Sequence, residues 1–236
     1  MNRSCRLVAI CLCLLSTRAM GDDEIAFDRL LNDTIEQQHV INAARRATVF
    51  LQNPCADARF SIENELRRYK PPSFDSSGKI VSGAWRQSVA EQGCGASRIL
   101  NVMLIVQGDG KLAVFPLLPG GTHADPLLQH DAVKYAMQSL ATALGGLEPN
   151  CTVMYVADTE FLAKEMQALP GAKSPPWKEL WTLQSRTQKM LVPMQFIPDP
   201  TGTTISAGPN SEIQVVPLAW QLPDITPRRK HDMPLQ

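Results

Sequence analysis

The segment from His123 to Asp131, which reads HADPLLQHD, holds the densest group of residues that could perform acid–base chemistry or bind a metal. Imidazoles and carboxylates are suitable general acids, general bases and metal ligands. The pattern nevertheless predicts a structural role. Asp125 followed by Pro126 is a helix start, and His130 and Asp131 fall between the apolar positions of that helix. Because no H-E-x-x-H or C-x-x-C spacing occurs in the chain, we expect no metal site.

Cys151 could act as a thiol nucleophile with His123 or His130 as its base. A reactive thiolate requires an exposed, electropositive position such as a helix N-terminus. Cys151 instead precedes the apolar run 153–156, which is typical of a buried strand. We therefore expect this thiol to be buried and inert, and the sequence assigns no catalytic residue.

The first 21 residues have the pattern of a secretory signal peptide. Arg3 and Arg6 give a positive start, residues 7–15 form an apolar run, and small residues precede a cleavage site before Asp22. The apolar run is too short to span a bilayer, and no later segment is long and apolar enough to do so. We expect a mature protein that is secreted or periplasmic.

Charge and composition narrow the classes of partner. Removing the three arginines of residues 1–21 leaves 20 basic and 23 acidic residues, a net charge of −3. Proteins that coat nucleic acid or anionic membranes need a positive surface, so neither partner is expected. The aromatic fraction is 6%, which does not favour an aromatic binding platform.

Three cysteines remain after removal of the signal peptide: Cys55, Cys94 and Cys151. Because export takes the chain into an oxidising compartment, one disulfide is expected, and three single pairings can be drawn. Cys55 follows a proline and Cys94 lies between two glycines, so both belong to the edges of elements. The sequence therefore favours a Cys55–Cys94 bond, with Cys151 left over.

The pattern of apolar residues predicts helices and antiparallel strands. An amphipathic helix is expected over 23–51, with a break near Asn42, and a second helix from Pro54 to Tyr69. Further elements are expected as strands at 85–92, 99–106, 112–115 and 152–157, helices at 125–145 and 159–169, a hairpin of 177–186 and 190–197, and short strands at 203–206 and 213–216.

These elements predict an α+β fold. An antiparallel sheet of two hairpin or meander units packs against one long helix, 125–145, with an N-terminal helical segment beside it. The order strand–helix–strand within 99–157 also allows a parallel pair. We expect one domain over 22–216, followed by an extended proline-rich tail at 217–236.

A displacement of 92 residues aligns two hairpin segments, 85–110 and 177–202. Trp85 then meets Trp177, and Ile105 meets Ile197, without a gap. The alternative is chance, because any two hairpins share an alternation with a period of two.

Trp177, Trp181 and Trp220 are the candidate binding residues. A tryptophan in a strand is more often part of the core than of a contact surface, but Trp220 lies in the proline-rich tail. An extended segment of that tail could dock on a partner.

The sequence favours an exported, non-enzymatic interaction or accessory protein with no cofactor, and a protein partner suits this hypothesis. Two alternatives remain open. One is a small exported enzyme that uses Cys151 or the segment with His123 and His130. The other is a carrier of small ligands, with a pocket between the long helix and the sheet. The oligomeric state does not follow from the sequence.

Overall fold

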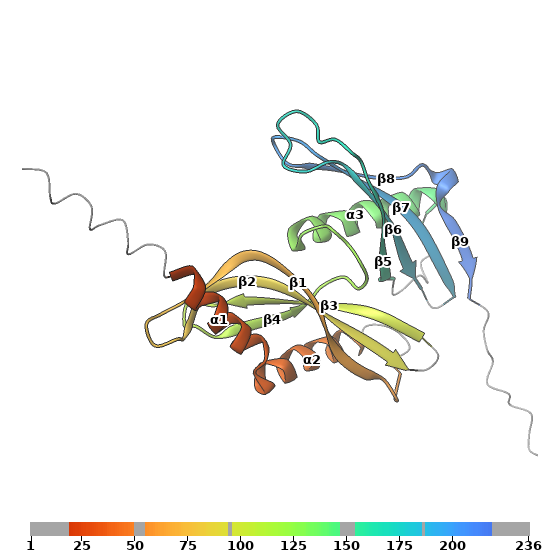
Figure 1. The fold of residues 1–236 in the computed structure, drawn as a ribbon. Helices are drawn as coiled ribbons and strands as arrows, with labels where there is room; N and C mark the ends of the chain where they lie inside the picture. Colours follow the sequence, from red (N-terminus) through yellow and green to blue (C-terminus); the bar gives the residue numbers. More distant parts are fainter. Residues whose placement is uncertain (1–18, 50–54, 94–95, 147–153, 186, 219–236) are drawn as a thin grey trace, which may run out of the picture.

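The computed structural model describes residues 19–49, 55–93, 96–146, 154–185 and 187–218. Its elements form two successive units, each with a helical segment followed by an antiparallel sheet (Figure 1). The first unit contains α1 (Ala19–Leu31), α2 (Thr34–Val49), β1 (Arg59–Phe74), β2 (Ile80–Gly93), β3 (Ala96–Val106) and β4 (Leu112–Pro116). The second contains α3 (Pro126–Ala143), β5 (Tyr155–Lys164), β6 (Trp177–Gln184), β7 (Gln188–Pro198), β8 (Thr203–Ala207), the short 3-10 helix η1 (Asn210–Glu212) and β9 (Gln214–Pro217).

Each sheet follows the order of the chain. The strands of the first sheet are ordered β1-β2-β3-β4, and those of the second β5-β6-β7-β8, with β9 also paired to β7. Every pairing in the described part of the chain is antiparallel, so the alternative of a parallel pair within 99–157 is wrong. The α+β class is confirmed.

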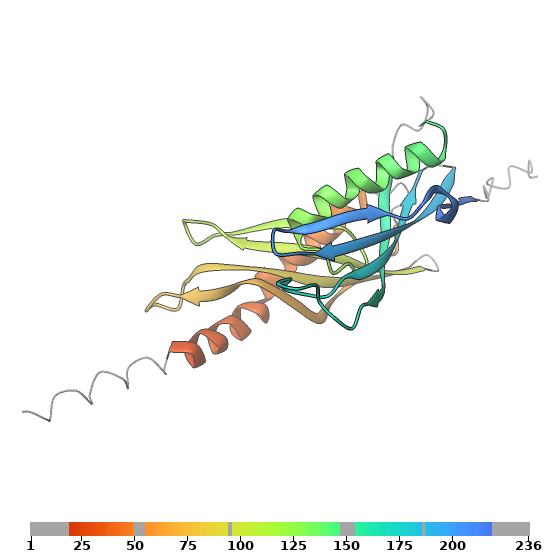
Figure 2. The same cartoon turned by 90° about the horizontal axis from the view of Figure 1, so that it is seen from above.

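Each sheet has its own helical cover and its own core. In the first unit Phe27 of α1 meets Trp85 of β2 edge to face, with ring centroids 5.0 Å apart. In the second unit Ala136 and Leu140 of α3 pack with Trp181 of β6. The expectation of one long helix packed against both hairpin units is not confirmed, because α1 and α2 pack with the first sheet, whereas α3 runs beside β8 of the second (Figure 2).

The displacement of 92 residues relates more of the two units than their central hairpins. It carries the start of α2 at Thr34 to the start of α3 at Pro126, and the start of β3 to that of β7. The register of the hairpin is also the same, because Trp85 pairs with Leu104 and Trp177 pairs with Phe196. The two units thus place their buried strand residues at equivalent positions.

The helix starts of the two units also correspond. Asp33 accepts hydrogen bonds from the backbone amides of Ile35 and Glu36, and Asp125 accepts one from that of Leu128. Both carboxylates satisfy amides of a first helical turn that have no partner within the helix. The predicted start of the helix at Asp125 is therefore confirmed.

Three predicted helical features are wrong. The N-terminal helix is interrupted at Asn32 and Asp33, rather than near Asn42, because Asp33 starts α2. Residues 59–69 of the helix expected to end at Tyr69 belong to strand β1, and residues 159–164 of the short helix expected at 159–169 belong to strand β5. In both strands, backbone pairing with a neighbouring strand replaces the helical hydrogen bonds.

No helix in the described ranges is long and apolar enough to cross a membrane. The residues predicted as a signal peptide lie outside the described part of the chain up to residue 18, and α1 begins at Ala19.

Candidate functional site

The structure separates the two histidines of the candidate acid–base segment. The His123 ring stacks on Phe161 of β5, with ring centroids 3.9 Å apart. His130 and Asp131 lie on α3 with largely exposed side chains, and the Asp131 carboxylate contacts His130 at 3.4 Å and the Lys134 ammonium at 3.1 Å. Across the described residues there is no cluster of three groups that could hold a metal ion.

The cysteines can be placed only in part, because Cys94 and Cys151 lie outside the described residues. A Cβ atom added to Gly93 would lie 2.9 Å from the Cys55 sulfur. The Cys55 sulfur therefore sits beside the residue that precedes Cys94 in the chain. The Cys55–Cys94 pairing remains a prediction.

Two of the three candidate binding tryptophans are core residues. Trp181 is 0% exposed, and Trp177, at 8%, stacks on Phe196 with ring centroids 4.9 Å apart. Neither indole offers an exposed contact surface in this structure. Trp220 lies outside the described residues.

Both indoles donate their N–H to Glu179, a fully buried carboxylate that the sequence analysis did not single out. Glu179 Oε1 accepts from Trp177 Nε1 at 2.8 Å, and Oε2 accepts from Trp181 Nε1 at 2.7 Å. Oε1 also accepts from the backbone N–H of His123 at 2.8 Å. The signal that could have found this site is the pattern Trp-x-Glu-x-Trp, because alternate residues of a strand share one face.

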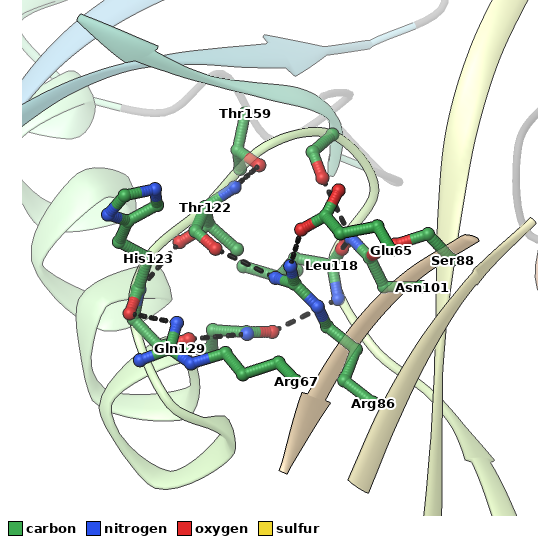
Figure 3. A network of polar contacts seen from close by, with 12 residues as sticks. Glu65, Arg67, Arg86, Ser88, Asn101, Leu118, Thr122, His123, Gln129 and Thr159 are labelled. Atoms are coloured by element: carbon green, nitrogen blue, oxygen red, sulfur yellow. Dashed lines mark hydrogen bonds and ion pairs between the residues drawn. The ribbon is translucent and has the colours of Figure 1, made fainter. Parts of the chain in front are cut away.

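A linker, residues 117–124, joins the two units and is held by buried polar side chains (Figure 3). The Asn101 carboxamide donates to the backbone oxygens of Leu118 and Gly120, both at 2.8 Å. The Thr159 hydroxyl donates to the Pro119 oxygen at 2.6 Å and accepts from the Thr122 N–H at 3.1 Å. One side chain from each sheet thus fixes the path of the linker.

Arg86 adds a charged contact to the linker. Its side chain is 4% exposed, pairs with Glu65 and donates from Nη1 to the Thr122 oxygen at 2.9 Å. Beside it Arg67 donates from Nη1 to the His123 oxygen at 2.6 Å. Both guanidinium groups donate hydrogen bonds to backbone oxygens of the linker. These charged residues therefore have a structural role.

The linker comes so close to β5 that only glycine fits at one position. Gly120 has φ +91°, and a Cβ atom there would lie 2.2 Å from the Thr159 backbone oxygen. A side chain would require both an unfavourable backbone conformation and a displaced strand.

The surroundings of His123 favour the neutral form of its imidazole. Partial burial lowers the pKa of His123 below its usual value, and the positive charges of Arg67, Arg86 and Lys164 lower it further. The Glu179 carboxylate acts in the opposite direction and raises it. A neutral ring stacked on Phe161 is consistent with a packing role.

An open apolar groove lies where the two units meet. This junction groove has a volume of about 330 Å³. Its lining comes from α2, β3 and the end of β4 in the first unit, from the linker, and from α3 and β5 in the second: Ala47, Leu100, Pro116, Leu117, Leu118, Pro119, Pro126, Gln129, His130, Val133, Tyr155 and Val156. Grooves of this size with mostly apolar walls are the usual form of small-ligand sites.

Gln129 is the most deeply buried polar residue of the groove lining, and its carboxamide is already bonded at both ends. Its Nε2 donates to the Ala124 oxygen at 2.9 Å, and its Oε1 accepts from the Leu118 N–H at 3.2 Å. Gln129 therefore connects two positions of the linker to α3. Its partners explain why a glutamine stands on the buried side of α3.

The chain matches no known protein family, no curated protein and no solved structure.

Proposed function

We propose that this chain is an exported, non-enzymatic binding protein that acts as an interaction or accessory module. The observation that carries the proposal is the junction groove, an apolar concavity of about 330 Å³ shared by the two units. Apolar concavities of a few hundred Å³ are typical places for a ligand to bind.

The buried charged side chains are bonded to other groups of the protein, which supports binding rather than catalysis. Glu179 accepts two indole N–H groups and one backbone N–H, and Arg86 is bonded to the linker and to Glu65. A catalytic acid or base must reach a substrate, whereas these groups contact the protein itself. They build the junction and so shape the groove beside it.

The export half of the proposal rests on the signal-peptide pattern of residues 1–21. Expression of the full chain, followed by mass determination of the protein in the medium or periplasm, tests it. We expect a mature chain that begins at Asp22. A protein retained in the cytoplasm with its first 21 residues would overturn this half.

Site-specific photocrosslinking in the exported fraction tests the binding half. A photoreactive phenylalanine analogue at Ala47 reaches into the groove, whereas the same group at the adjacent Arg46 points to solvent. We expect an adduct from position 47 and none from position 46. The mass of the adduct separates a protein partner from a small molecule, and the absence of an adduct at position 47 would contradict the proposal.

The structure also gives an observation in favour of a small-ligand carrier. The sequence alternative placed a pocket between the long helix and the sheet, and the groove has α3 as one wall and Leu100 of β3 and Val156 of β5 as others. Under this second function the groove would carry its ligand without changing it.

A further inference from the structure

We propose that the junction groove takes the uncharged aliphatic chain of a lipid-like molecule and leaves the polar end of that molecule in solvent beside His130. This inference rests on the proposed function, because it names the class of ligand for the same groove. Three features of the lining carry it: its aliphatic side chains, the proline-rich part with few free hydrogen-bond donors, and the position of its histidine.

The walls are aliphatic. Leu100, Leu117, Leu118, Val133 and Val156 contribute side chains, and no residue of the described lining is a lysine, arginine, aspartate or glutamate. A charged ligand group inside the groove would lose its hydration and meet no opposite charge. The part of the ligand that enters must therefore be uncharged.

Part of the lining, around residues 116–119 and Pro126, offers few free hydrogen-bond donors. Pro116, Pro119 and Pro126 have no backbone N–H, and the Leu118 N–H is already bonded to the Gln129 side chain. The other end of that side chain is bonded to Ala124. A polar ligand group in this part of the groove would lose its bonds to water without replacement, which disfavours it strongly.

The histidine of the lining lies at the solvent side. The His130 side chain is 69% exposed and contacts the Asp131 carboxylate at 3.4 Å. A polar or charged end of the ligand beside His130 would keep its water, while the chain behind it is buried. The volume of about 330 Å³ suits such a chain.

Titration of the purified mature protein with 11-(dansylamino)undecanoic acid tests the inference, with 1-decanol as the competitor. We expect saturable 1:1 binding with a blue-shifted dansyl emission, and displacement by 1-decanol. Ala47→Phe, which fills the groove, should weaken binding at least tenfold, whereas Arg46→Phe should change it less than twofold. Circular dichroism checks that both variants are folded.

Val133→Ser provides a second route if Ala47→Phe does not fold. It replaces an aliphatic wall residue by a smaller polar one and should weaken binding about threefold or more. No saturable binding to the wild type, or equal binding to Ala47→Phe, would overturn the inference. A protein adduct at position 47 with no binding of the dansyl probe would overturn the aliphatic ligand and leave the binding function standing.

Discussion

The backbone N–H of His123 donates to the buried Glu179 carboxylate at 2.8 Å, which ties the end of the linker to the centre of the second sheet. The same carboxylate orders the indoles of Trp177 and Trp181. One side chain thus connects the second core to the junction between the two units.

Replacement of Glu179 should destabilise the fold in proportion to the donors it leaves unpaired. Glu179→Gln retains one acceptor oxygen, so at least one buried donor loses its partner, at a cost of about 1–3 kcal/mol. Glu179→Leu leaves all three donors unpaired and should cost more. Urea unfolding measures both changes, and Glu160→Gln on the exposed side of β5 is the control, expected within about 0.5 kcal/mol of wild type. Equal stability of Glu179→Leu and wild type would contradict this role.

Gly120→Ala should destabilise the protein by more than about 2 kcal/mol, because the new Cβ atom meets the Thr159 backbone and the backbone conformation is unfavourable. The matched control is Gly108→Ala, where a Cβ atom would meet nothing within 4 Å and φ lies outside the left-handed range. Thermal unfolding of the two variants measures the difference. A similar loss of stability in both variants would show that the linker does not lie as close to β5 as the structure indicates.

His123 should make stability depend on pH on the acid side of neutrality. Its pKa in the folded protein is lowered, mainly by burial and then by Arg67, so the unfolded chain binds the proton more readily. The free energy of unfolding should therefore fall as the pH drops through the usual histidine pKa near 6.5 and toward the lowered value. His123→Gln should flatten this part of the profile. An unchanged slope in urea titrations from pH 8 to pH 5 would count against the effect.

The Cys55–Cys94 bond should contribute about 4 kcal/mol, by the entropy of closing a loop of roughly 40 residues. The double variant Cys55→Ser/Cys94→Ser should unfold correspondingly earlier in urea, with Cys151→Ser as the control. Alkylation without reductant should label one thiol per chain, and only after denaturation. Labelling of all three mature cysteines would contradict the pairing.

The sequence predicts elements well where local chemistry and fold agree. The Asp125-Pro126 start defines α3, and Gly145-Gly146 follows its end, where the Gly146 N–H donates to the Ala141 oxygen at 2.8 Å. Strand β3 is equally clear, because both of its faces are apolar over 102–106.

Strand β1 was predicted as a helix because irregularities in its pairing change the spacing of its apolar residues. Its pairing with β2 shifts register between Ile62 and Leu66 and again between Arg68 and Lys70. Each irregularity inserts extra residues between two inward-facing side chains of the strand. The inward residues are then three to four positions apart instead of two, and that spacing indicates a helix. The second half of β5, from Thr159 to Lys164, was predicted as a helix for another reason: the Thr159 hydroxyl, a suitable helix cap, bonds to the linker instead.

The junction could not be predicted because its contacts join residues far apart in the chain. Glu179 and His123 are 56 positions apart, as are Arg67 and the His123 oxygen it binds. Local patterns carry no information on such pairs. The alternation of Trp177, Glu179 and Trp181 was visible in the sequence, but the backbone amide that completes the site was not.

Native mass spectrometry of the exported protein, purified without detergent, tests most directly whether the junction groove is a binding site. We expect a species heavier than the chain that starts at Asp22, present in wild type and Arg46→Phe and lost in Ala47→Phe. A wild-type spectrum with the mature chain alone, or an added mass that Ala47→Phe retains, would contradict this expectation.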